Sequence, residues 1–469
     1  MISREFSEYR GLWWLPEDLT RRISGTLVIG ERLKLTLDDE LVKTPRLVSG
    51  EVQQYPKNSW DTHPVIHGEK RDGTAITMFD TWGGSIGLPF ELMGTEVWDA
   101  QSIALGALLS QSDLFSEVSV SIDFLWDWTG SEQHKANWDK DHNFTLVGGT
   151  TQLCNVRVDG KTYELRAGVK THHFGRSGLE IQDDAVWIVK LETGCNLKDA
   201  INDVVIPLQG FATFCTLKAN RVTQLECTPE GSTGAIKIIT TLRAHDAPSR
   251  SESQHVAFLQ LLPGNIFLTS PHKILGRWLI AWNELREPLS RLLSIEYATA
   301  MYLEHRLSTV VQAGESLHKG RWDWRKLSKA EYKRRRREVL RSGPESLRSW
   351  LSQMLSGRND PSLRERMNDV VHRALDSGFP YLLSDFDAFV NDLLVARNST
   401  SHGGKLDISY DRQHWLGEGL TWLLRALCLQ ELGLKSDQIR LCLANNPDLT
   451  RCASMLGWSR APSTSIAKL

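Results

Sequence analysis

The spacing of apolar residues changes part-way along this chain of 469 residues. Up to about residue 262, short runs rich in β-branched and aromatic residues recur between turn signals, for example at 23–29, 74–79, 118–124, 184–191 and 235–242. Asp-Gly pairs within 71–74 and 158–161 predict hairpin turns, because such turns need positive φ angles. This pattern predicts an antiparallel β-sandwich or a jelly-roll-like barrel.

Beyond Leu262-Pro263-Gly264 the period becomes helical. From Leu275 onward, apolar residues recur three and four positions apart and strand signals nearly vanish, which predicts an all-α bundle. We therefore expect an α+β multidomain protein. Its β-rich N-terminal domain would span 1–265 and its helical domain 272–469.

One predicted helix carries the most informative residues of the chain. Ser384 and Asp387 predict a capping box at its start. One apolar face follows, with the spacing of a helix, at Phe386, Phe389, Val390, Leu393 and Leu394. Arg397 falls on the same face, where a guanidinium is costly unless something compensates it. Gly403-Gly404 predicts the helix end, which would leave His402 accessible beside the arginine.

These residues form the pattern Arg397-Asn398-x3-His402. Histidine titrates near neutrality and suits proton transfer, whereas arginine offers a planar donor fork that matches phosphate oxygens. A second Arg-x4-His pattern, Arg250 to His255, lies in a Ser-rich stretch, and we interpret it as a coincidence in a surface loop. The first pattern also fits a simpler interpretation, in which basic residues satisfy the last carbonyls of a helix.

A basic segment runs from Lys319 to Arg341, with eleven basic against three acidic residues and with Trp322 and Trp324 among them. Such a segment suits RNA phosphates, with aromatic rings available for stacking. The candidate RNA-binding residues are Arg321, Arg325, Lys333, Arg334, Arg335, Arg336 and Arg337. The alternative is a solvated helix face.

Composition excludes several classes of protein. Charge is nearly balanced, with 55 basic and 57 acidic residues, so overall charge does not indicate a nucleic-acid binder. Seven irregularly spaced cysteines, a charged N-terminus and no long apolar run predict a cytoplasmic protein with reduced thiols and no membrane partner. His63/His67 and His172-His173 lack the spacing of a metal site, so we expect no metal and no cofactor. Trp13-Trp14 and Trp126/Trp128 fit a sandwich core or a ligand platform.

Several of these residues together resemble a known family. Arg397-Asn398-x3-His402, Glu315-x3-Lys319 on an earlier helix and the opening Gly11-Leu-Trp-Trp-Leu-Pro16 resemble Apea-like HEPN antiphage defence proteins with their β-rich N-terminal domain. The resemblance implies a metal-independent endoribonuclease that works as a homodimer through its HEPN domain. It implies catalytic roles for Arg397, Asn398 and His402 and supporting roles for Glu315 and Lys319.

The function expected from this resemblance is RNA cleavage in abortive infection, with 2′,3′-cyclic phosphate and 5′-hydroxyl products. Transfer RNA is one candidate substrate, and a phage-derived trigger would act through the β-rich domain. Two alternatives stay open. The first is a non-catalytic HEPN scaffold that binds nucleic acid or a protein partner. The second is a carbohydrate- or peptide-binding sandwich with a helical dimerisation domain.

Overall fold

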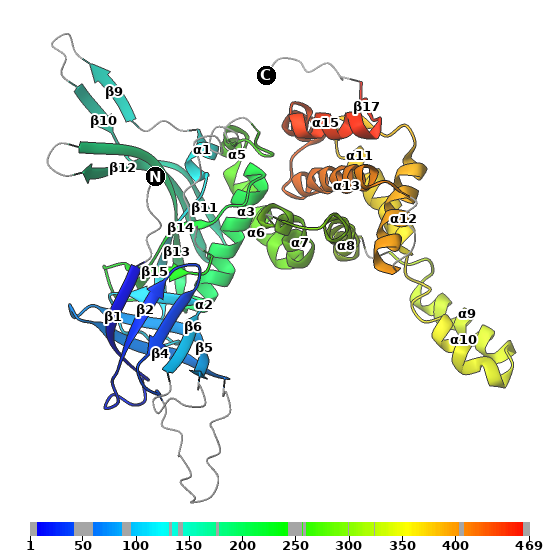
Figure 1. Ribbon diagram of the computed structural model, residues 1–469. Coiled ribbons are helices and arrows are strands. Elements are labelled where there is room, and N and C mark those ends of the chain that lie inside the picture. The colour runs from blue at the N-terminus through cyan, green and yellow to red at the C-terminus, as the bar shows by residue number, and fades with distance from the viewer. Residues whose placement is uncertain are drawn as a thin grey trace, which may run out of the picture. The chain divides into compact units, whose positions relative to one another are not determined.

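The computed structural model describes residues 7–41, 60–86, 95–130, 134–138, 144–174, 178–242, 256, 259–298, 300–322, 324–402 and 408–462. Of residues 399–402 it describes the backbone alone. The chain divides into unit 1 (Met1–Ala212 with Asn220–Phe258) and unit 2 (Thr213–Ala219 with Leu259–Leu469). Unit 1 is rich in strands and unit 2 in helices (Figure 1), so the predicted change from β to α is confirmed.

Antiparallel strands of unit 1 form one large sheet that closes partly on itself. The strands of this sheet are β1 (Ser7–Trp14), β2 (Ile23–Ile29), β3 (Leu33–Leu37), β4 (Trp60–Lys70), β5 (Ala75–Ile86), β6 (Thr95–Ala100), β7 (Ser102–Leu105), β8 (Phe115–Ile122), β11 (Thr151–Val158), β12 (Lys161–Phe174), β13 (Gly178–Cys195), β14 (Val222–Pro229) and β15 (Ile236–Thr240). In the order β5-β4-β1-β2-β3-β6, the last strand pairs again with β5, which closes a barrel. The remaining strands extend the sheet from β7 to β11, and β9 (His134–Trp138) and β10 (Phe144–Gly148) pair separately.

Both predicted Asp-Gly turns join neighbouring strands of the sheet. Gly73, between β4 and β5, has φ +84, and Asp159 and Gly160, between β11 and β12, have φ 47 and 70. Alternate residues of β2 and β3 are buried and fill the barrel, as the period of two requires. Trp13 and Trp98 lie in the same core.

A helical stretch that the sequence pattern did not predict begins in unit 1 and ends in unit 2. Helices α2 (Leu197–Ala200), η1 (Ile201–Val205) and α3 (Ile206–Thr216) follow one another between β13 and β14. Residues 207–216 of α3 are all buried. A helix surrounded by protein has no polar face and therefore no amphipathic period, so the expectation of strands up to residue 262 was wrong here. The short helix α1 (Leu125–Thr129) was missed as well.

Unit 2 is helical throughout most of its described length. Its elements are α5 (Gly264–Thr269), α6 (Pro271–Glu284), α7 (Arg286–Tyr297), α8 (Leu303–Arg321), α9 (Lys329–Ser342), η2 (Glu345–Leu347), α10 (Arg348–Met354), α11 (Leu363–Asp376), α12 (Phe386–His402), α13 (Tyr410–Glu431), α14 (Ser436–Ala444), α15 (Pro447–Leu456) and the strand pair β16 (Tyr381–Leu382) and β17 (Ser459–Arg460). Helices α8, α11, α12 and α13 all contact one another and enclose the core, with most of α13 buried.

The predicted apolar face of α12 faces this core, with Phe389, Val390, Leu393 and Leu394 buried. The helix start differs by one residue from the prediction. Asp385, rather than Ser384, caps it, because its Oδ1 accepts the Ala388 N–H at 2.8 Å. Gly403 and Gly404 lie outside the described residues.

Candidate active site and nucleic-acid surface

Arg397 lies near the C-terminal end of α12, on the edge of the buried face. Its side chain is half-buried, and its Nε atom is shielded from solvent. The Nη1 atom donates to Oδ1 of the exposed Asn398 at 3.1 Å. The amide next to the arginine therefore helps to orient the guanidinium, with the base of the fork inside the bundle and one tip beside an exposed residue.

His402 is the last residue of α12. It lies five residues beyond Arg397, which is about 7.5 Å along the axis of a helix. Its side chain lies outside the described part of the structure, so the pairing of its ring with Arg397 stays a prediction. The second Arg-x4-His pattern, from Arg250 to His255, also lies outside the described residues.

Glu315 and Lys319 form an ion pair on α8, with Oε1 and Nζ 2.8 Å apart. The lysine side chain is about half exposed and the glutamate less so. Glu315 thus pairs with Lys319 of the same helix, four residues further on. Helix α8 contacts α12, so the pair belongs to the same four-helix core as the predicted site. Its supporting role stays a prediction.

Next to this pair, sequence analysis missed a buried network centred on His318. The imidazole is 0% exposed, and each ring nitrogen has a partner on α11. Arg366 Nη1 lies 3.3 Å from Nδ1, and Asp369 Oδ2 lies 3.1 Å from Nε2. Because a guanidinium can only donate, Nδ1 must accept, and the proton of the neutral ring is on Nε2. Arg373 completes the network by donating to the same Asp369 oxygen at 2.8 Å.

Burial lowers the pKa of His318 below its usual value of 6.5. The neighbouring Arg366 and Arg373 cations lower this pKa further, whereas Asp369 acts in the opposite direction. A protonated ring would also turn Nδ1 into a donor that faces another donor on Arg366. His318 is therefore built to stay neutral and to join α8 to α11.

Two of the candidate RNA-binding residues have structural partners in unit 2. Arg321 is bonded to Glu284 of α6 and Glu431 of α13, with 3.0 Å from its Nε to Glu431 Oε2. Arg336 donates to Ser352 Oγ on α10 at 2.7 Å. Arg321 thus ties three helices together, and Arg336 ties α9 to α10.

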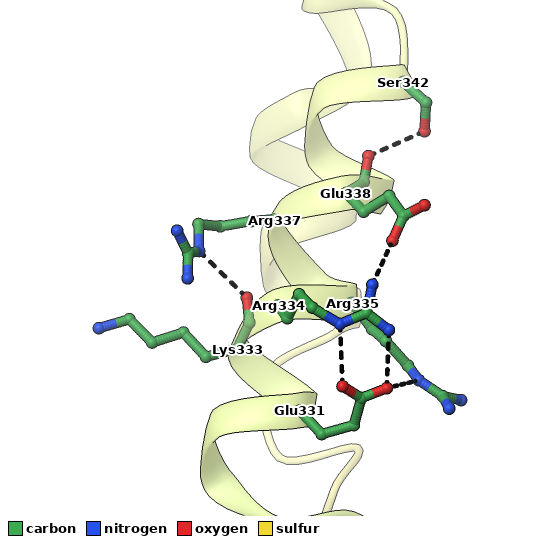
Figure 2. Close-up of polar contacts among 7 residues, drawn as sticks. All are labelled: Glu331, Lys333, Arg334, Arg335, Arg337, Glu338 and Ser342. Atoms are coloured by element: carbon green, nitrogen blue, oxygen red, sulfur yellow. Dashed lines mark hydrogen bonds and ion pairs between the residues drawn. The ribbon is translucent and has the colours of Figure 1, made fainter.

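The other candidate cations differ in their partners. Glu331 accepts hydrogen bonds from Arg334 and Arg335, and this lowers the pKa of its carboxyl to about 2. Figure 2 shows the two arginines around this carboxylate, whereas Lys333 and Arg337 point away from it on another side of α9. Arg325, before α9, pairs with Asp360 at 3.1 Å. One side of α9 thus carries arginines paired with a carboxylate, whereas Lys333 and Arg337 lie on another side, away from it.

Trp322 is less available for base stacking than its position in the sequence indicates. The guanidinium of Arg373 lies over its ring at 4.6 Å, and the ring packs edge-on against His318. Trp324 is 38% exposed. Of the two interleaved tryptophans, Trp324 is the better candidate for contact with a base.

In unit 1, three of the four tryptophans considered for a ligand platform lie in the interior, and the fourth, Trp126, is partly buried. Trp13, Trp14 and Trp128 are nearly inaccessible, which favours the core interpretation over a ligand platform.

A separate cavity of about 360 Å³ has Gln101, Asn202 and Lys198 among its lining residues. Its volume lies within the range of small-molecule sites. Among the described residues no cluster of three potential metal ligands occurs, and none of the described helices is long and apolar enough to cross a bilayer.

The chain thus combines a strand-rich unit that contains a closed barrel with a helical unit that carries an Arg-Asn-x3-His pattern at the end of one helix. Comparison with known families gives two matches: ApeA N-terminal domain 1 over residues 8–294 and Apea-like HEPN over residues 308–438. The first covers more than half of the chain, which therefore belongs to the ApeA family of HEPN proteins. No curated protein and no solved structure matches the chain.

The two family matches meet between the end of α7 and the first residues of α8. The N-terminal match thus includes α5, α6 and most of α7, which belong to unit 2. The HEPN match contains Glu315, Lys319, the basic helix α9 and the Arg397-Asn398-x3-His402 pattern. Family membership implies a nuclease-type protein of antiphage defence.

Proposed function

We propose that this protein is a metal-independent endoribonuclease with Arg397, Asn398 and His402 as its catalytic residues. The observation that carries the proposal is the position of Arg397. Its guanidinium is half-buried at the end of α12, with Nε shielded and Nη1 bonded to Asn398, inside the HEPN match. A guanidinium fixed in this way meets a phosphate without much further loss of side-chain freedom.

The chemistry needs only the RNA and these side chains. His402 takes the proton of the ribose 2′-hydroxyl, and the 2′ oxygen attacks the adjacent phosphorus. Arg397 donates to the phosphoryl oxygens as negative charge builds up on them. The bond from phosphorus to O5′ then breaks, and O5′ takes up a proton. The products are a 2′,3′-cyclic phosphate and a 5′-hydroxyl end. Asn398 orients the guanidinium.

The β-rich unit is the proposed regulator, because uncontrolled RNA cleavage harms the host. Its cavity near Gln101 and Asn202 is the first place to look for a small-molecule signal, and a phage-derived trigger is the proposed activator. Two copies would associate through the HEPN domain as a symmetric dimer, which brings two α12 ends into one composite groove. Light scattering of the purified protein measures this oligomeric state.

The test is RNA cleavage by purified, activated protein in the presence of EDTA, with transfer RNA as the first substrate. Sequencing of the product ends should find cyclic phosphates and 5′-hydroxyls. His402→Ala and Arg397→Ala should abolish the products. The second Arg-x4-His pattern offers a matched control, since His255→Ala should leave cleavage unchanged. Cutting by both site variants at the wild-type rate contradicts the assignment.

A non-catalytic scaffold is the second candidate, and the exposed cations of α9 that have no ion pair among the described residues favour it as much as they favour a nuclease. In that case binding to RNA or to a protein partner is the whole function. Phage protection that survives His402→Ala but is lost on replacing Lys333 and Arg337 identifies the scaffold.

A further inference from the structure

Helix α9 carries two sets of cations with different surroundings. Arg334 and Arg335 share Glu331, and Arg334 also reaches Glu338 at 3.3 Å. A second set, Lys329, Lys333, Arg337 and Arg341, is exposed, and none of its members has an ion pair among the described residues. We call this second set the α9 stripe.

The members of the α9 stripe are spaced four residues apart, so they follow one another along one row of the helix. The row spans about 18 Å, because twelve residues rise about 1.5 Å each. Lys333 and Arg337 lie on the side of α9 opposite the Glu331 cluster (Figure 2). The Arg337 Nε atom donates to the Lys333 carbonyl oxygen at 3.4 Å, so the two neighbours are held on the same row.

The rest of the hairpin explains why this row can take part in binding. None of the residues of α9, η2 or α10 is buried, although α9 and α10 lie side by side (Figure 1). The hairpin is held by polar contacts, such as Arg336 to Ser352 and the buried Asn359 amide to the Leu327 backbone. Among the described residues, the side chains of the stripe make no such contact with α10 and no ion pair with a carboxylate, so these exposed cations are available to a ligand.

We infer that the α9 stripe is the phosphate-binding track for the RNA substrate. Arg334 and Arg335 instead stabilise helix α9 through their ion pairs with Glu331. This inference rests on the proposed function and adds the residues and the mode of contact. Point charges along a rigid helix bind the phosphate backbone and carry no sequence information, so the track supplies affinity while the cleavage site supplies the chemistry. Lys329 and Arg341 join the binding residues, and Arg321, Arg334, Arg335 and Arg336 leave them.

The experiment compares two double variants of the full chain in a His402→Ala background, where cleavage does not interfere. Lys333→Gln/Arg337→Gln removes two stripe charges, and Arg334→Gln/Arg335→Gln removes the same net charge from the same helix. Fluorescence anisotropy with a labelled single-stranded RNA gives the affinity over a range of salt concentrations. The stripe variant should make the negative slope of log K against log salt shallower by about 1.4, or about 0.7 per contact. The matched control should keep the wild-type slope.

Two outcomes overturn the inference: equal loss in both variants, which reflects general charge, or an unchanged slope in the stripe variant. Substitution of all four stripe residues sharpens the result, since the loss should roughly double. A failure of the proposed function is detected by a different measurement, the cleavage assay. If His402→Ala still cuts RNA, the catalytic assignment fails, and the anisotropy comparison then uses 2′-O-methyl RNA, which lacks the attacking hydroxyl and still decides the track.

Discussion

Two charged clusters in the helical unit are built in opposite ways. Around His318 every polar group has a partner: Arg366 on Nδ1, Asp369 on Nε2, and Arg373 on Asp369. At the end of α12 the Arg397 guanidinium is half-buried and bonded to Asn398, which is itself exposed. In the first cluster the imidazole and Arg366 are buried, whereas the second cluster lies on the boundary between the core and solvent.

This difference indicates which of the two histidines, His318 or His402, can act as a general base. A general base must reach the substrate and must change its protonation near neutral pH. His318 does neither, because it is fully buried and its pKa is lowered. His402 ends a helix in the matched HEPN segment. The better-connected histidine is therefore structural, and the histidine at the helix end is the proposed catalyst. Four predictions test this separation.

The largest effect is expected at the helix end. His402→Ala should lower the rate of RNA cleavage by about 10² to 10⁴, the usual contribution of general acid–base catalysis. The melting temperature should change little, because His402 is the last residue of α12 and the ends of helices fray. Single-turnover cleavage and calorimetry of the same preparation measure both. Arg397→Lys should also lose most activity, since an ammonium cannot present a planar donor fork.

Substitution of the buried histidine should have the reverse effect. His318→Ala removes the partner of the buried Arg366 Nη1 and one of the two partners of Asp369, and we expect a loss of about 3 kcal/mol in the free energy of unfolding. Urea unfolding followed by tryptophan fluorescence measures it, because Trp322 and Trp324 lie against the ring. His305 is a matched control, since it is exposed on the same α8 helix and its replacement by alanine should have little effect. A cleavage defect without a stability loss in His318→Ala contradicts the separation.

The lowered pKa of His318 also predicts a pH dependence of stability. Below pH 6.5 the unfolded chain takes up a proton on this residue, whereas the native state, with its lower pKa, does not. Stability should therefore fall as the pH drops below 6.5, until the native pKa is reached. His318→Gln can keep one donor and one acceptor but cannot titrate. Its unfolding free energy, measured at the same pH values, should lack this part of the slope. Parallel curves for the two proteins contradict the neutral, buried state.

Features that depend on neighbouring residues could be predicted from the sequence. The two Asp-Gly turns and the buried face of α12 follow from short-range spacing, and the structure contains them. The pairing of Arg334 and Arg335 with Glu331 could also have been predicted, because Glu331 lies three and four residues before them. The total charge of the segment does not show that spacing.

Features that depend on tertiary contact could not be predicted in this way. The partners of His318 lie 48 and 51 residues away on α11, and no local pattern connects them. Helix α3 has no polar side, so its sequence gives no helical period. The closure of β6 onto β5 is also a long-range event, which is why a sandwich and a barrel were both open. The candidate site at the α12 end could be proposed from the sequence because its three residues lie within two turns of one helix.

The smallest effect is expected at Glu315 and Lys319 on α8. These two side chains are more exposed than His318, and among the described residues they form an ion pair only with each other. Their ion pair is partly exposed, so a double-mutant cycle with Glu315→Gln and Lys319→Gln should give a coupling of only about 0.3–0.5 kcal/mol in stability. If the pair positions the site, Glu315→Gln should slow cleavage several-fold and leave the pH profile of the rate unchanged, because no proton passes through it. A loss as large as that of His402→Ala would make Glu315 a catalytic residue. Wild-type cleavage in both single variants would reduce the pair to a helix-surface contact and leave the α12 end to act without support from α8.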